Sequence, residues 1–221
     1  MNISQQFAPP FKLVGSFFIS AMIIFFISIL LLFNFDINLI HTQNSLVLSW
    51  VHLYLLGFVM MSIFASMAQL LPVVLEVEHF SIDLYYVVNP LLFMGTTLIF
   101  IGFYKYPMVL SYGGVIVFIS FFIFLFESFL TIKKVKKLNF LSSTVLVANI
   151  FLFLGLVVAI VLSFVYSGVL FLNIKALMLS HIYLVFVGYL GITIISMRYI
   201  LIPMFWLSHS FNHIYLKIAF Y

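Results

Sequence analysis

Two histidines are notable in this sequence because each lies within a long apolar stretch of the chain. His52 occurs within residues 49–74, and His181 occurs within residues 180–204. An imidazole can bind a metal ion, and it can take up or release a proton near neutral pH. Ionisable side chains are costly in the hydrocarbon core of a membrane. We therefore treat both histidines as candidates for a functional site.

The composition indicates an integral membrane protein. Of the 221 residues, 66% are hydrophobic and 6% are charged, and the mean hydropathy is +1.34. Soluble domains carry roughly 25% charged residues. The chain has no cysteine, which excludes disulfides, thiolate metal sites and iron–sulfur clusters. The net charge of +4 arises largely from four lysines clustered within residues 133–137, between two apolar segments. This clustering indicates membrane orientation and no nucleic-acid partner.

The apolar runs predict the fold. A transmembrane helix needs about 20 mainly apolar residues. The sequence predicts one all-α domain over residues 1–221, with six spans at residues 11–33, 46–75, 85–104, 108–132, 142–166 and 175–207. Polar and helix-breaking residues separate these runs. We therefore expect a polytopic transmembrane bundle.

The distribution of lysines predicts its orientation. With six spans, both termini share one side of the membrane with the loops after the second and fourth spans. That side carries Lys12, the lysines of residues 133–137 and Lys217, whereas the other side carries Lys105 and Lys175. Cytoplasmic loops are enriched in Lys and Arg. We expect both termini in the cytoplasm and a location in the inner, cytoplasmic membrane of a cell.

The two histidines are predicted at matching depths on parallel helices, each on the order of 9 Å from the outer helix end at 1.5 Å per residue. Facing helices can supply the two axial ligands of one haem b. Gly188 lies two α-helical turns beyond His181, where a missing side chain would leave room for a flat ring. Lys175 could pair with a haem carboxylate or anchor the helix at the interface. Alternatively, His52 and His181 each only donate a hydrogen bond to a neighbouring helix.

Other polar residues leave alternatives open. His209 and His213 are four residues apart and could bind a second metal, or they could be solvated residues of the chain end. His41, in the first outer loop, could belong to a copper or proton site or be solvated. Glu127 could form an ion pair with Lys133 or Lys134, or it could be a proton-relay acid. Four methionines could bind Cu(I) or pack in the core: Met60, Met61, Met67 and Met178.

Two blocks of sequence resemble a known superfamily. The block "HLYLLGFVMMSIFASMAQLLPV", which begins at His52, resembles the histidine-bearing second helix of haem-copper oxidase catalytic subunits. It is similar to the NnrS family, haem- and copper-containing membrane proteins linked to nitric oxide, in its His…Gly-Phe…Pro pattern. The block "HIYLVFVGYLGITIISMRYI" is similar to a later helix of that family. The matching residues are His181, Gly188, Gly191, Met197 and Arg198.

The resemblance implies a reduced member of this superfamily with one haem site. Complete oxidases also hold copper through three further histidines, two of them adjacent, and this chain has no adjacent histidine pair. We expect a membrane-embedded b-type haem protein that transfers electrons or binds nitric oxide or another diatomic. A homodimer or subunits of a respiratory complex are its expected protein partners.

Two other functions remain open at this point. The chain could be a non-enzymatic accessory, assembly or copper-delivery subunit of a respiratory membrane complex, with no clear copper ligand set in its sequence. A small proton-coupled transporter is the third possibility, although few polar residues fall near the middle of the spans, where such substrate sites lie.

Overall fold

The computed structural model describes residues 7–35 and 44–206. Of these residues, 84% are helical and none is in a strand. Within the described ranges, six helices are long and apolar enough to cross a membrane: Phe11–Asn34, Ser45–Leu75, Asp83–Tyr104, Val109–Ile132, Phe140–Tyr166 and Ile174–Pro203. The predicted all-α, six-span membrane bundle is confirmed. The predicted end of the last span, Leu207, lies outside the described residues.

Three of the spans are divided into segments of different winding. In chain order, the elements are α1 (Phe11–Leu31), η2 (Leu32–Asn34), α2 (Ser45–His52), η4 (Leu53–Met60), α3 (Met61–Leu75), α4 (Asp83–Tyr104), α5 (Val109–Ile132), α6 (Phe140–Tyr166), α7 (Ile174–Ile182), η5 (Tyr183–Gly191) and α8 (Ile192–Trp206). The second span is therefore α2–η4–α3, and the sixth is α7–η5–α8. In both of these spans the middle segment is a π-helix.

Asparagine side chains define where three of the helices begin. Asn44 accepts a hydrogen bond from the backbone N–H of Leu46 at the start of α2, and Asn173 accepts one from Lys175 at the start of α7. Asn139 and Ser142 form a reciprocal pair of bonds at the start of α6. Such caps satisfy N–H groups that have no partner in the first helical turn. The caps of α2 and α7 fix where the helices that carry His52 and His181 begin.

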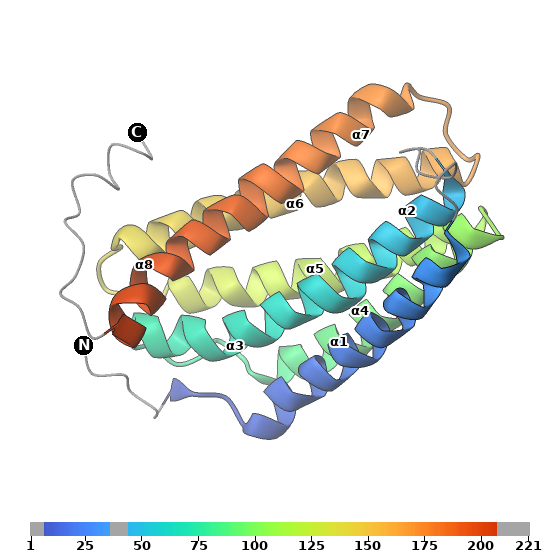
Figure 1. Ribbon diagram of the computed structural model, residues 1–221. Coiled ribbons are helices and arrows are strands. Elements are labelled where there is room, and N and C mark those ends of the chain that lie inside the picture. The colour runs from blue at the N-terminus through green and yellow to red at the C-terminus, as the bar shows by residue number, and fades with distance from the viewer. Residues whose placement is uncertain (1–6, 36–43, 207–221) are drawn as a thin grey trace.

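The spans form a bundle in which α6 lies between α5 and the sixth span (Figure 1). Helices α4 and α5 form an antiparallel hairpin, and α1 packs against η4 and α3. The second span therefore contacts α1 on one side and α4 on the other, whereas α7 and η5 pack on α6. The outer halves of the second and sixth spans thus rest on different neighbours.

Aromatic rings fill the core between α3, α4 and α5. Phe64 and Phe124 are fully buried and stacked, with ring centroids 3.8 Å apart. Phe121 packs against Phe64, and Tyr85 packs against Phe124. The outward faces of the helices instead expose many apolar side chains, which suits contact with lipid.

Candidate functional site

His52 is the last residue of α2, and two neighbours set the orientation of its ring. Its Nδ1 atom lies 2.8 Å from the carbonyl oxygen of Leu48, one turn earlier. A carbonyl oxygen only accepts hydrogen bonds, so Nδ1 carries the proton and Nε2 carries the lone pair of the neutral imidazole. The ring stacks on Phe103 of α4, with centroids 4.9 Å apart.

His181 on α7 has the same protonation pattern with a partner on another helix. Its Nδ1 atom lies 3.1 Å from the carbonyl oxygen of Gly155 on α6. A Cβ atom at residue 155 would come within 2.8 Å of Cγ2 of Val185, so a glycine here allows the sixth span to approach α6 closely. Among the described residues, none makes a hydrogen bond to Nε2 of either His52 or His181.

The same unusual winding follows both histidines. The π-helix η4 begins directly after His52, and η5 begins two residues after His181. In a π-helix each hydrogen bond spans five residues instead of four, and such turns are rare and frequent at functional sites. Both begin within a His-x-Tyr-Leu pattern, at residues 52–55 and 181–184. This pattern is visible in the sequence and occurs at the start of both π-helical segments.

A cavity of about 660 Å³ lies between the second span, the helices α4, α5 and α6, and the sixth span. Both His52 and His181 line it. The other polar side chains in its wall are Ser163, Tyr166 and Lys175. The remaining wall is apolar and includes the residues Phe103, Phe118, Phe121, Leu152 and Val185. The structure thus places the two histidines in the wall of one cavity.

Lys175 and Gly188 have different relations to this cavity. Lys175 belongs to its wall, where an ammonium group can pair with a carboxylate of a ligand. Gly188 packs instead against α6, because a Cβ atom there would lie 2.6 Å from the ring of Phe151. Gly188 would share the face of His181 in an α-helix, but the wider turns of η5 rotate it away. This glycine provides close helix packing and not room for a ligand.

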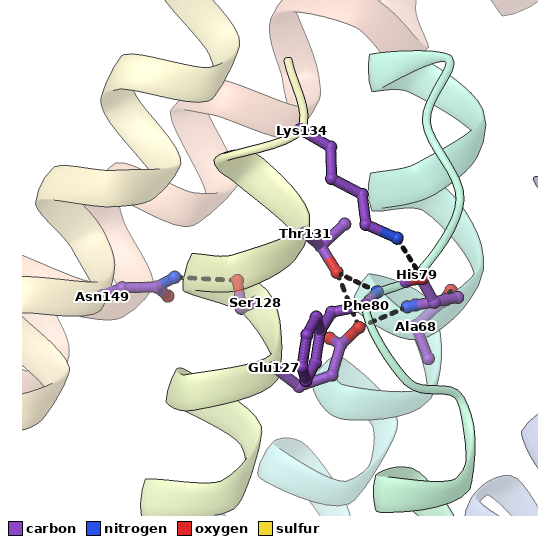
Figure 2. Close-up of polar contacts among 8 residues, drawn as sticks. All are labelled: Ala68, His79, Phe80, Glu127, Ser128, Thr131, Lys134 and Asn149. Carbon is purple, nitrogen blue, oxygen red and sulfur yellow. Dashed lines mark hydrogen bonds and ion pairs between the residues drawn. The ribbon is translucent and has the colours of Figure 1, made fainter.

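A second polar site lies at the loop between α3 and α4 (Figure 2). Glu76 ends α3 in the left-handed conformation, with φ of 55°, and the chain then turns back towards the bundle. The ring of His79 consequently lies against the interior. Its Nε2 atom is 2.7 Å from the carbonyl oxygen of Ala68 on α3, and its Nδ1 atom is 2.8 Å from Oε1 of Glu127 on α5.

Further hydrogen bonds connect this site to the loop. The Thr131 hydroxyl donates to Oε1 of Glu127 at 2.6 Å and accepts the backbone N–H of Phe80 at 2.9 Å. The ammonium group of Lys134 donates to the carbonyl oxygen of His79 at 2.7 Å. Glu127 itself is fully buried.

The expected ion pair of Glu127 with Lys133 or Lys134 is wrong. Glu127 points into the bundle and meets His79, whereas Lys134 reaches the backbone of the loop. The ammonium group of Lys133 lies 5.5 Å from the ring centroid of Phe129. A buried carboxylate selects a partner within the bundle, while lysines remain at the surface. No sequence signal links His79 to Glu127, because the two residues are 48 positions apart.

His209 and His213, the predicted second metal pair, and His41 lie outside the described residues. Within the described parts of the chain, no group of three or more His, Cys, Asp or Glu side chains could hold a metal ion.

The fold and the cavity define the protein as a multi-pass α-helical membrane protein with a partly open cavity of ligand size between its helices. No protein-family model, curated protein or solved structure matches the chain.

Proposed function

We propose that the protein binds one haem b in the cavity, with His52 and His181 as the two axial ligands. One observation carries the proposal: each imidazole donates through Nδ1 to a backbone carbonyl, which leaves the lone pair on Nε2, and both histidines line one cavity. Histidines that bind metals usually have their other ring nitrogen held in this way. The resemblance to haem-copper oxidase catalytic subunits and to the NnrS family supports the same pair of ligands.

The cavity wall has the chemistry that a haem requires. Its volume of about 660 Å³ falls within the range of roughly 300–1,000 Å³ for small-molecule sites. The wall is mainly apolar, which suits the macrocycle, and Lys175 supplies a cation for its carboxylates. Phe103 keeps the ring of His52 in a fixed plane by stacking. These residues would hold and orient the group.

The two ligands are held differently, which bears on the choice between electron transfer and gas binding. A haem supplies one-electron transfer when both axial positions are filled, and it binds a diatomic when one is released. His52 is fixed by its own helix and by Phe103. His181 is fixed instead by the contact between the sixth span and α6. We propose that His181 is the ligand that is released if nitric oxide or another diatomic binds.

Absorption spectroscopy tests the proposal. The protein, purified after expression with ample haem, is expected to give a reduced-minus-oxidised spectrum of a bis-histidine haem b. His52→Gly and His181→Gly should each lose it, and added imidazole should restore it by entering the space of the missing side chain. His79→Gln is the matched control, because His79 is buried in the same bundle but outside the cavity. A wild-type protein without a Soret band would exclude haem binding.

Copper delivery is the second candidate function, and one observation favours it. Met60 and Met178 line the same cavity as His52 and His181, and thioether and imidazole groups are ligands of Cu(I). This alternative predicts a colourless protein with one bound copper ion, which is lost in His52→Ala and in Met178→Leu. Metal analysis beside the absorption spectrum separates it from the haem protein.

The cellular setting proposed for this function is the inner membrane, with both termini in the cytoplasm. The distribution of lysines along the chain supports this orientation, with four of them within residues 133–137. The cavity would then lie in the outer half of the membrane. A homodimer or the subunits of a respiratory complex are the proposed protein partners.

A further inference from the structure

We infer that His79 and Glu127 form a proton-binding site, separate from the cavity, which holds one proton between Nδ1 and Oε1 and exchanges it with water at the α3–α4 loop. This inference stands independently of haem binding, because neither residue lines the cavity.

Hydrogen-bond geometry requires the shared proton. Nε2 of His79 faces the carbonyl oxygen of Ala68 at 2.7 Å, so Nε2 carries a proton. Nδ1 then faces Oε1 of Glu127 at 2.8 Å. Without a proton between them, two lone pairs would meet at hydrogen-bond distance. One proton must therefore lie on this contact, either on the imidazole or on the carboxyl group.

Two further buried oxygen atoms lie beside the pair. Oε2 of Glu127 and the hydroxyl of Tyr85 are both buried, and neither has a hydrogen-bond partner among the described residues. The ring of Tyr85 lies edge-on to that of His79, with centroids 5.3 Å apart. Both atoms therefore belong to the same buried polar cluster as the contact of His79 with Glu127.

The loop provides the route to bulk water. His79 belongs to the loop, and its side chain is 8% exposed, whereas Glu127 is fully buried. The exposed Lys134 fixes the backbone of His79 through its carbonyl oxygen. On the other side, aromatic rings connect the site to the cavity wall. Tyr85 contacts both His79 and Phe124, and Phe124 stacks on Phe64. Phe64 in turn contacts Phe121 of the cavity wall. Proton exchange therefore takes place through the imidazole and the loop, and not through the cavity.

Few other charges surround the pair. Helix α3 has no titratable side chain. The titratable and charged groups on the other elements include Glu76 and Glu78 of the loop, Asp83 and Tyr85 of α4, Lys133 and Lys134 at the end of α5, and Tyr189 of η5. Of these, Lys134 and Tyr85 contact His79.

Two spectroscopic readouts on the full-length protein test the site. Infrared spectra of protein with ¹³C-carboxyl-labelled glutamate report a protonated Glu127, and ¹⁵N spectra of histidine-labelled protein report Nδ1 of His79. As the pH is varied, we expect one of these signals to report the loss of the shared proton. In D₂O, the same signal should report replacement of this proton by deuterium. Glu127→Gln should remove the infrared signal and His79→Gln the nitrogen signal, while Glu76→Gln/Glu78→Gln should keep both.

Two hydroxyl variants distinguish a proton site from a fixed structural contact. Thr131→Val removes a hydrogen bond to Oε1 of Glu127 and should change the pH at which the signal changes. Ser128→Ala removes a neighbouring hydroxyl that is bonded to Asn149 instead and should leave that pH unchanged (Figure 2). If neither wild-type signal changes over the pH range in which the protein stays folded, the pair holds no exchangeable proton and the inference is wrong.

Discussion

The Nδ1 atom of His181 lies 3.1 Å from the carbonyl oxygen of Gly155, so a side chain of the sixth span is held by the backbone of α6. His52 instead bonds to Leu48 within its own helix. The two imidazoles therefore depend on different contacts. A change that separates the sixth span from α6 should displace His181 and leave His52 in place.

Replacement of Gly155 by valine tests this dependence. The new Cβ atom would meet Val185 at 2.8 Å and push η5 away from α6. Overpacking of this kind costs about 1–3 kcal/mol. We expect haem spectra of Gly155→Val to lose the bis-histidine form. Gly15→Val is the control, because the nearest atom to its Cβ is 3.8 Å away on Phe11. Equal spectra for the two variants would contradict the proposed role of Gly155.

Lys175→Gln is expected to weaken haem binding through the loss of a charge in the cavity wall. A charge-assisted hydrogen bond to a carboxylate contributes roughly 1.5–3 kcal/mol, so affinity should fall about ten-fold or more. Haem dimethyl ester, which has no free carboxylates, should bind the wild type and the variant equally. Titration of the haem-free protein with both ligands measures this difference. Lys105→Gln is the control, since Lys105 lies outside the cavity wall.

Phe64→Ala should destabilise the bundle. Phe64 is fully buried and stacked on Phe124 with centroids 3.8 Å apart. In lipid, the variant loses van der Waals packing more than burial from water. We expect its free energy of unfolding to fall by roughly 2 kcal/mol or more. Phe122→Ala should have little effect, because Phe122 is 49% exposed on the outside of α5. Thermal unfolding in detergent, followed by circular dichroism, compares the two variants.

Replacement of the four lysines within residues 133–137 by glutamine should reduce the fraction of molecules with both termini in the cytoplasm. Orientation depends on Lys and Arg near the ends of the spans. Reporter fusions in the loops at residues 105–108 and 133–139 measure the topology. Glu76→Gln/Glu78→Gln should leave it unchanged, because acidic residues contribute little to orientation. A wild-type reporter pattern of the opposite sense would contradict the cytoplasmic termini.

Hydropathy was sufficient to predict the six spans, because each apolar run has the length of a membrane-crossing helix and is bounded by polar residues. The grouping of His52 and His181 at one cavity also follows from the sequence, since both lie at similar distances from the ends of parallel spans. The depth of a residue along a helix depends on the number of residues before it, and a few turns of different winding change this depth little.

The side of a helix that a residue faces changes strongly with winding. For this reason, the predicted place of Gly188 on the same face as His181 is wrong. The sequence contains no breaker that marks the π-helical turns of η5, yet those turns decide which side Gly188 faces. The pairing of His79 with Glu127 was missed for another reason. It depends on a loop that reverses at Glu76, whose left-handed conformation is uncommon for a residue other than glycine.

The π-helical segments have a consequence for changes in chain length. A π turn accommodates an extra residue within an otherwise α-helical rod. Deletion of one residue from η4 or η5 would let that segment relax to ordinary winding, with the flanking helices still crossing the same thickness of lipid. Deletion of one residue from α5 would instead turn one half of its buried face outwards. Divergent copies of this chain should therefore vary in length just after each histidine before they vary anywhere else within the spans.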